Sequence, residues 1–446
     1  MRSNGDILIN LKSLSITTLT LYMLTASLYI AVFNSLSIQI VILITILGTL
    51  ILNEVIKNGS ILLIKTDVFF LIATITVLGS LHGFTLITSE FAEPVIISIG
   101  MIISIFIRGS IENYNYSFRL IRWGGVFYAL SVMLTYFFPS LYQTLFLSQL
   151  RPTVSTDILT SLENGYYTGF TGQVGYTAGY IVNALGLVFC GWIAYRKGFS
   201  KKEIFVFLIL FIGLLLTQKR AHLLFLFLSL FIVYIQFTSD FYVKMKKIIK
   251  TAFIIILVII PFVILTSLTS IGRMLFARFY DTIHAFSLGK DITSNRIPLL
   301  EHAWDIFLQN PVFGIGWGNF RETVVGNVTD HTEMETHNIY LQLLSETGIV
   351  GTVFILTPFL LTYIYTMKIT RMLNRKKDYY SYEWKMAVLF SLFIQTFFLL
   401  YGLTGNPLYD YSFLFMYFLS FGLIYSFWQS NKRKNSTYNQ SFRFRH

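Results

Sequence analysis

Two cationic side chains, Lys219 and Arg220, lie in a short stretch between two long apolar runs of the sequence. A charge beside apolar helices is costly unless it meets a partner, so a tight turn that carries two cations is suited to binding an anion such as a phosphate or a diphosphate. The same side chains could instead extend to the head groups of surrounding lipids. The residues alone leave both interpretations open.

A third cation, Arg296, opens a segment in which apolar residues recur at helical spacing, from 295 to 307. A guanidinium group can bind two phosphate oxygens at once, which an ammonium group cannot do. The competing interpretation is a salt bridge to an acidic neighbour in the sequence, and the candidates are Asp291, Glu301 and Asp305.

Titratable side chains cluster just before a late apolar run. Among them, His337 is placed to act as a proton acceptor or as an organiser of hydrogen bonds, although a helix cap or a packed histidine remains a structural alternative. Together with His331, Glu333 and Glu335 it alternates along one segment, so the four side chains would share a face of an extended chain. The spacing typical of metal-binding helices is absent, and we therefore predict no metal.

The elements that must position these side chains are membrane helices. Of the 446 residues, 54% are hydrophobic and only 13% are charged, whereas soluble proteins carry about 25% charged residues. This composition excludes a soluble enzyme, a disordered scaffold and a fibrous repeat. It predicts an all-α polytopic membrane protein, with 1–446 as a single integral membrane domain. We expect about twelve transmembrane helices, at 16–33, 36–52, 68–87, 91–107, 120–138, 176–194, 204–216, 221–237, 248–268, 349–367, 386–403 and 411–428.

The distribution of basic residues predicts the orientation of the chain. If the N-terminus is cytoplasmic, 26 of the 34 lysines and arginines fall in inner segments and 8 fall outside. This asymmetry follows the positive-inside rule and predicts that both termini are cytoplasmic. The net charge of +12 is therefore a signal of topology, and we expect no nucleic-acid partner.

Two long loops are predicted on the outer side, at 139–175 and 269–348. The second is the largest stretch outside the spans, and its amphipathic part suits a helix that lies along the membrane face. It also holds glycines at alternate positions, Gly314, Gly316 and Gly318. Such glycines suit a bent backbone that another chain segment or a ligand approaches closely, and a structural turn is favoured over a phosphate loop.

These motifs together resemble the signature of the O-antigen ligase/polymerase family, which includes Wzy-type polysaccharide polymerases and WaaL-type O-antigen ligases. The resemblance rests on Asn310-Pro311, Gly314-Ile315-Gly316 and Asn319-Phe320, followed by the run His337-Asn338-Ile339-Tyr340-Leu341-Gln342-Leu343-Leu344-Ser345-Glu346-Thr347-Gly348-Ile349-Val350-Gly351. A dozen spans with one large, late outer loop extend the similarity to most of the chain.

The resemblance implies a GT-C-like membrane glycosyltransferase that uses a glycan on a polyprenyl diphosphate and works without metal, nucleotide or other cofactor. It implies that Arg220 and Arg296, with Lys219 beside them, bind the diphosphate. The family histidine falls on His337, which would activate an acceptor hydroxyl in an inverting transfer, with Glu346 or Glu335 as weaker candidates.

Within the family we favour a polymerase that transfers a growing glycan onto a lipid-linked repeat unit. The segments 170–176, 217–220 and 402–410 resemble those of capsule or exopolysaccharide polymerases. The alternatives are a ligase that transfers the glycan to lipid A core and, from another class, a transporter of the lipid-linked unit. The expected location is the bacterial plasma membrane with the active site on its outer face, and the expected partners are the bilayer, the lipid-linked oligosaccharide, a chain-length regulator and a flippase.

Overall fold

The computed structural model describes twelve stretches of the chain: 10–33, 36–59, 63–81, 92–150, 152–195, 200–237, 242–243, 246, 287, 296–325, 335–375 and 379–443. In these stretches the regular elements are all helices, as the composition predicted. In chain order the α-helices are α1 (Leu11–Phe33), α2 (Leu36–Asn58), α3 (Lys65–Gly79), α4 (Ala92–Phe106), α5 (Asn115–Phe137), α6 (Pro139–Leu145), α7 (Pro152–Glu163), α8 (Val174–Ala194), α9 (Lys201–Leu216), α10 (Arg220–Gln236), α13 (Arg296–Gln309), α14 (Phe320–Val325), α15 (Ile339–Arg375), α16 (Tyr382–Tyr401) and α17 (Tyr411–Arg443).

Within the described residues, six helices are long and apolar enough to cross a membrane: α2, α5 with the turn before it, α8, α15, α16 and α17. The membrane character of the chain is thereby confirmed. Each predicted span overlaps a helix except 248–268, which lies outside the described residues, so the count of twelve stays a prediction. The predicted span at 349–367 is part of α15, which begins earlier, at Ile339.

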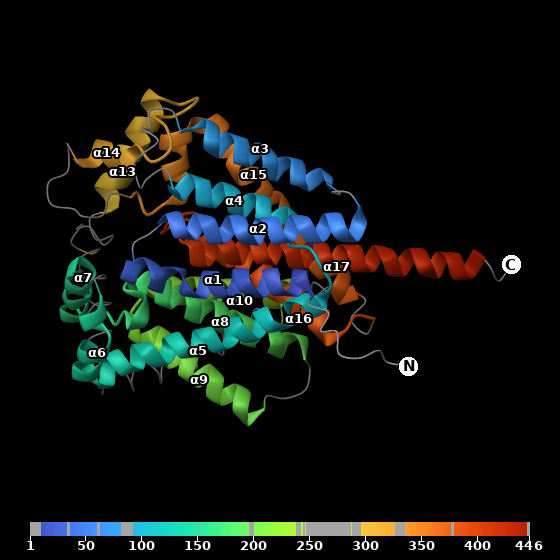
Figure 1. The fold of residues 1–446 in the computed structure, drawn as a ribbon, viewed down its shortest axis with the longest axis horizontal. Coiled ribbons are helices and arrows are strands. Elements are labelled where there is room, and N and C mark those ends of the chain that lie inside the picture. The colour runs from blue at the N-terminus through green and yellow to red at the C-terminus, as the bar shows by residue number, and fades with distance from the viewer. Residues whose placement is uncertain are drawn as a thin grey trace.

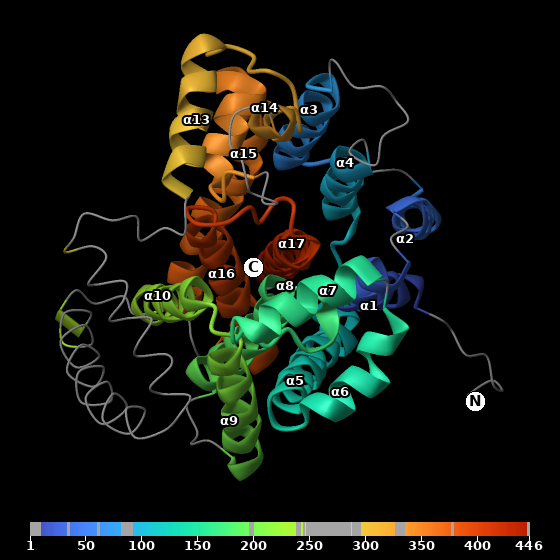
Figure 2. The ribbon, with the colours of Figure 1, turned by 90° about the vertical axis from the view of Figure 1, so that its left-hand side faces the viewer.

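The helices run mostly lengthwise beside one another (Figure 1). In the end-on view α17 lies near the middle, next to α8 and α16 (Figure 2). The most apolar stretch of α17 is 94% buried inside the molecule and that of α8 is 83% buried, against 22% for α2. Two central helices are therefore enclosed by protein, while α2 presents most of its surface outward.

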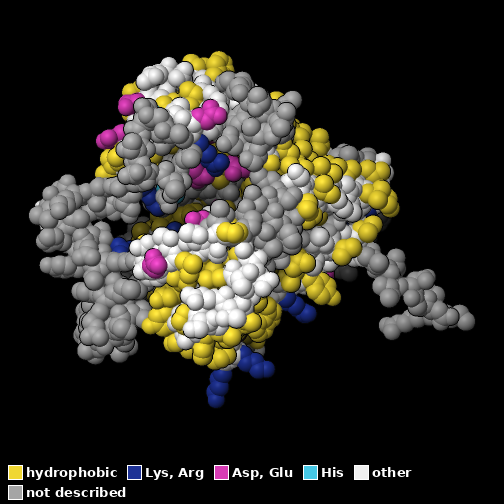
Figure 3. Space-filling model, turned by 60° about the vertical axis from the view of Figure 1, so that its left-hand side comes forward, with side chains coloured by type: hydrophobic (Ala, Val, Ile, Leu, Met, Phe, Trp, Pro, Cys, Tyr) yellow, Lys and Arg dark blue, Asp and Glu magenta, His cyan; other side chains and the backbone are white. Residues whose placement is uncertain are grey.

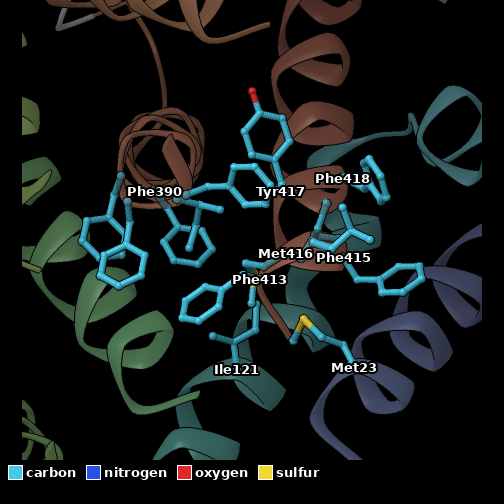
Figure 4. Close-up of a cluster of buried hydrophobic side chains, with 14 of the residues drawn as sticks. Met23, Ile121, Phe390, Phe413, Phe415, Met416, Tyr417 and Phe418 are labelled. Carbon is cyan, nitrogen blue, oxygen red and sulfur yellow. The ribbon is translucent and has the colours of Figure 1, made fainter. Parts of the chain in front are cut away.

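The core between these helices is rich in aromatic side chains (Figure 4). Phe413 and Phe418 of α17 and Phe390 of α16 belong to it, and each is at most 2% exposed. Phe393 lies so close to α8 that a Cβ atom on Gly186 would come within 2.0 Å of its ring. Small residues let helix backbones approach closely in membranes, which explains the packing of α8 on α16.

The molecule has two different ends (Figure 1). At one, which we call the terminal end, α1 begins and α17 finishes. The other, which we call the loop end, is made of α6, α7, α13 and α14 together with the turns at 217–219 and 402–410. Both predicted outer loops contribute to the loop end: α6 and α7 fall within 139–175, and α13 and α14 fall within 269–348.

Helix α13 has two apolar sides. Leu299, Ala303 and Ile306 are buried and pack with Phe320 of α14. Ile297 and Trp304, two of the apolar residues that recur at helical spacing in 295–307, are 41% and 46% exposed. The helix therefore packs on the protein through one stripe, and the predicted stripe lies on the outward side.

Candidate functional site

The two halves of the sequence signature pack against each other at the loop end. Helix α15 is interrupted at Gly348, which has φ +63° and ψ −171°, a conformation almost restricted to glycine. The glycine-rich segment after α13 is seated against this break: the amide of Ile349 donates to the carbonyl of Pro311 (2.9 Å), and the amide of Ile315 donates to the carbonyl of Ser345 (3.0 Å). The second chain segment that the alternate glycines were expected to accommodate is thus α15 itself.

Two glycines allow this contact. A Cβ atom on Gly314 would lie 2.4 Å from the carbonyl carbon of Glu346, and one on Gly348 would lie 2.3 Å from the backbone of Val312. Both glycines also have positive φ. The signature therefore encodes a backbone-to-backbone junction, in which any side chain at either position would collide with the opposite segment.

Glu346 lies beneath this junction and is completely buried. Its Oε1 accepts a hydrogen bond from Nε2 of Gln342 (2.7 Å), and its Oε2 accepts one from the hydroxyl of Tyr409 (3.0 Å). The amide of Gly318 also donates to its carboxylate. Glu346 is therefore held by donors from three parts of the chain: Gln342 of α15, Tyr409 of the 402–410 turn and Gly318 of the glycine-rich segment.

His337 is half-buried at the start of α15 and has φ +51°, a left-handed conformation that is rare outside glycine. The next residue, Asn338, caps the helix, since its Oδ1 accepts hydrogen bonds from the amides of Tyr340 (3.0 Å) and Leu341 (3.1 Å). Its Nδ2 donates to the carbonyl of Leu403 (3.3 Å). Asn338 therefore supplies the helix cap, and the histidine beside it is placed next to the 402–410 turn.

Arg296, the first residue of α13, reaches the same turn. Its Nη1 donates to the carbonyl of Thr404 (3.3 Å), and its charge acts on Tyr401 at the end of α16. Of the acidic partners predicted for it, Asp291 lies outside the described residues. The structure thus brings Arg296 and His337 to one turn, although they are 41 positions apart in the sequence.

Lys219 and Arg220 lie at the start of α10, after Gln218, whose φ of +55° makes the turn tight. Arg220 is exposed and Lys219 is half-buried. The ring of His222, one turn along the helix, packs against the ring of Tyr401 with a centroid distance of 4.6 Å. Tyr401 therefore lies near both the start of α10 and Arg296.

A second charged cluster on the other side of this turn was not identified from the sequence. Arg321 of α14 forms ion pairs with Glu335 (2.6 Å) and with Glu93 at the start of α4 (3.4 Å). Asn406 donates from Nδ2 to the free carboxylate oxygen of Glu335 (2.6 Å). We call Glu93, Arg321, Glu335 and Asn406 the ion cluster. Although burial alone lowers the pKa of Arg321, the two carboxylates raise it above its ordinary value, so this arginine stays charged.

One signal in the sequence could have pointed to the ion cluster. Arg321 is one of the eight basic residues on the predicted outer side, where the positive-inside rule acts against a cation. Its partner Glu93 comes from a helix more than two hundred positions earlier, and no local pattern connects the two.

Asp410 adds a further carboxyl group near the ion cluster. It immediately precedes α17, and its Oδ1 accepts hydrogen bonds from the amide (2.9 Å) and hydroxyl (2.5 Å) of Ser412. Burial raises the pKa of this half-buried carboxyl to about 6, against the effect of the hydrogen bonds from Ser412. Its charge and those of Glu335 and Glu93 act on Tyr176, which is half-buried at the start of α8.

Figure 3 shows the loop end hollowed between the α13–α14 part and the α5–α7 part, with basic and acidic side chains on the walls. The hollow combines cations on the α10 and α13 side with carboxylates and tyrosines on the α4, α14 and α17 side. Among the described residues, no group of three or more histidine, cysteine or acidic side chains is arranged to hold a metal ion. His331 and Glu333, half of the quartet considered from the sequence, lie outside those residues.

Comparison with known protein families matches residues 205–356 to a family model described as O-antigen ligase. The matched range contains Lys219, Arg220, Arg296, His337 and Glu346. No curated protein matches the chain. Residues 205–356 of this helical membrane protein are therefore similar to the O-antigen ligase family.

Proposed function

We propose that the protein is a membrane glycosyltransferase that polymerises a polysaccharide such as O-antigen, capsule or exopolysaccharide. It transfers a growing glycan from polyprenyl diphosphate onto a lipid-linked repeat unit, with inversion and without a metal. The observation that carries this proposal is that Arg296 and the segment of His337 lie at the 402–410 turn, while the start of α10, which carries Lys219 and Arg220, packs against Tyr401 through His222. All four site residues fall in the matched range 205–356.

The cationic side of the hollow binds the donor diphosphate in this proposal. Arg220 and Arg296 begin α10 and α13, so the partial positive charge of each helix start adds to that of the side chain. Charge develops on the leaving oxygen as the glycosidic bond breaks. Two guanidinium groups held in place stabilise that charge without reorganising, which is the largest contribution that such a site can make.

The reaction needs no covalent intermediate. The oxygen of an acceptor hydroxyl attacks the anomeric carbon from the face opposite the diphosphate, and polyprenyl diphosphate leaves with the electrons of the broken C–O bond. The hydroxyl proton passes to a base, for which His337 is our candidate. The acidic and aromatic side of the hollow, with Tyr176, Asp410 and the ion cluster, receives the acceptor sugar, because carboxylates accept hydrogen bonds from hydroxyl groups and tyrosine rings cover apolar sugar faces.

The proposal includes a GT-C-like arrangement with twelve crossings in the bacterial plasma membrane, cytoplasmic termini and a loop end that faces outward. A flippase supplies the lipid-linked substrate on that side, and a chain-length regulator acts with the enzyme. A site at one end of the molecule is unlike a transporter, whose binding site lies near the membrane midplane.

A second candidate function is an O-antigen ligase that transfers the finished glycan to lipid A core. The description of the matching family model favours it. Deleting the gene separates the two functions when the surface glycan is resolved on a gel. A single repeat on the acceptor indicates a lost polymerase, whereas lipid-linked polymer beside a bare acceptor indicates a lost ligase. Lipid-linked units that accumulate on the cytoplasmic leaflet would indicate a transporter.

The site is tested by Arg220→Ala, Arg296→Ala and His337→Ala, each expressed in the deletion strain. We expect normal amounts of protein in the membrane and loss of long-chain glycan, with single repeat units still made. Arg119→Ala is the matched control, because Arg119 is an exposed arginine near the opposite end of the molecule, on α5. Normal chain length in all three site variants would overturn the assignment.

A further inference from the structure

The backbone at His337 adopts a conformation that requires support from its neighbours. With φ +51°, the residue lies in the left-handed region, which side chains other than glycine rarely occupy. Such a conformation persists where the surrounding structure determines it, and it is common at functional sites. The groups that hold the two flanking residues therefore decide where the imidazole lies.

After His337 in the sequence, Asn338 is held in place because it caps the start of α15. Before His337, Thr336 is completely buried, and Oε1 of Gln342 accepts from its amide (3.0 Å) and lies 3.0 Å from its hydroxyl. The hydroxyl of Thr336 also lies 2.8 Å from the carbonyl of Asn338 and accepts from the Asn338 amide (3.1 Å). Thr336 thus closes a loop of hydrogen bonds around the histidine.

Gln342 can hold Thr336 only if its own amide group is oriented. Its Nε2 donates to Glu346 (2.7 Å), which fixes which end of the amide faces Thr336. Glu346 is in turn anchored by the hydroxyl of Tyr409 and the amide of Gly318. A continuous line of hydrogen bonds therefore runs from the glycine-rich segment and the 402–410 turn to the residue before His337.

We propose that Gln342 is a positioning residue for His337, and that Glu346 orients Gln342 and exchanges no proton with the substrate. This inference rests on the proposed function, in which His337 activates the acceptor hydroxyl. Gln342 is 1% exposed and Glu346 is not exposed at all, so neither contacts a saccharide in the hollow. The acceptor of Gln342 holds Thr336, and the acceptors of Glu346 hold Gln342, Tyr409 and Gly318.

The first test is Gln342→Leu, which removes the hydrogen bonds to Thr336 and to Glu346 but fills a similar volume. A misplacement of about 1 Å at a reacting group lowers the rate by about 100-fold, so we expect kcat to fall between about 10-fold and 100-fold. The KM for the lipid-linked donor stays nearly unchanged, because the cationic side is untouched. Purified protein in detergent with the native lipid-linked repeat unit supplies both constants.

The matched control is Gln395→Leu. Gln395 is also a completely buried glutamine with a side-chain hydrogen bond, but it lies within α16 and its partner is Ser420 of α17 (3.1 Å). We expect Gln395→Leu to alter stability and to leave kcat nearly unchanged. An unchanged kcat in Gln342→Leu, or an equal loss in both variants, overturns the inference.

The role of Glu346 is tested with Glu346→Gln and Glu346→Leu. Glutamine keeps a carbonyl oxygen that accepts from Gln342, and the hydroxyl of Tyr409 can turn to accept from the new amide. We therefore expect Glu346→Gln to retain kcat within about 5-fold, and Glu346→Leu to lose as much as Gln342→Leu. A loss above about 1,000-fold in Glu346→Gln would show that Glu346 itself transfers the proton.

A third pair covers the case in which the leucine variants fail to accumulate. Thr336→Val removes only the hydroxyl and Thr336→Ser restores it, so we expect a reduced kcat in the first and recovery in the second. Equal kcat values in this pair would overturn the role of the Thr336 hydroxyl. If the unmodified protein transfers no glycan in the assay, the proposed function has failed, whereas an active protein with insensitive variants refutes only the positioning role.

Discussion

Individual side chains at the loop end are held by charge pairing across helices. Arg321 binds two glutamates from different elements, with side chains between 22% and 28% exposed, so part of the water that would solvate them is missing. In such a setting an ion pair stabilises the fold little more than a neutral pair of similar size does. Removing one partner destabilises the fold strongly, because the remaining charges stay poorly solvated and have lost their counter-charge.

This asymmetry predicts the behaviour of Arg321→Met. Methionine keeps the length of the side chain but leaves Glu93 and Glu335 facing each other, so we expect the free energy of unfolding to fall by about 1–3 kcal/mol. Adding Glu335→Gln removes one of the opposed charges. The double variant should therefore lose less than the sum of the two single variants in thermal or denaturant unfolding of the detergent-solubilised protein. Additive losses would show that the ion cluster is not coupled.

Asp410 predicts a pH dependence of stability. Burial raises the pKa of its carboxyl to about 6 in the folded protein, whereas an aspartate in an unfolded chain titrates near pH 4. Between these values the folded protein retains a proton that the unfolded chain has lost, so the contribution of this group to stability falls as the pH rises from about 4 to 6.

Asp410→Asn removes this titration and keeps an oxygen for the hydrogen bonds from Ser412. We expect the melting temperature of the variant, relative to the unmodified protein, to rise between pH 4 and pH 6 and to level off above pH 6. Melting curves of both proteins across pH 4–8 give the difference, in which titrations of other groups cancel. Parallel curves over the whole range would contradict the raised pKa.

At the scale of elements, the sequence predicts helices better than it predicts their junctions. Apolar runs of membrane-crossing length identify α8, α16 and α17, because the length and hydrophobicity of a run can be read without knowing its neighbours. The charge asymmetry also drew attention to Arg220 and Arg296. In contrast, the burial of Glu346 depends on Tyr409 and Gly318, and these three residues meet only after α15, the glycine-rich segment and the 402–410 turn have packed together.

The break in α15 gives a prediction for an element junction. Gly348→Ala places a methyl group about where the backbone of Val312 lies and forces an alanine into a left-handed conformation. The conformation alone costs about 1–2 kcal/mol, and the collision adds to it, so we expect a clear fall in unfolding free energy and in protein yield. Gly48→Ala is the matched control.

Gly48 lies inside α2, and a Cβ atom there would meet nothing within 4 Å. The same substitution at this position should leave stability unchanged or raise it by about 0.5–1 kcal/mol, since alanine favours a helix interior. Unfolding of both variants in one detergent separates the two effects. Equal stability of Gly348→Ala and Gly48→Ala would show that the junction between the signature halves is loose.

At the scale of the whole molecule, the two ends differ in charge and in construction. The predicted inner side carries 26 of the 34 basic residues, while at the loop end Arg321 is paired with two partly buried glutamates. If the loop end faces outward, then the substrate hollow opens to the side on which lipid-linked repeat units are joined. Orientation in the membrane is therefore the property on which the proposed function depends as a whole.

The orientation can be measured because the chain has one cysteine, Cys190, which is completely buried in α8. Cys190 should not react with a membrane-impermeant maleimide. Labelling of an introduced cysteine therefore shows on which side of the membrane that cysteine lies. Glu163→Cys places an exposed thiol at the end of α7 in the loop end, and Lys202→Cys places one at the start of α9, towards the terminal end. In spheroplasts we expect labelling of Glu163→Cys alone, with Lys202→Cys labelled only after permeabilisation, because positive charge retains that loop inside. The reverse pattern would place Lys219, Arg220 and Arg296 on the cytoplasmic side and exclude an outer-face transferase.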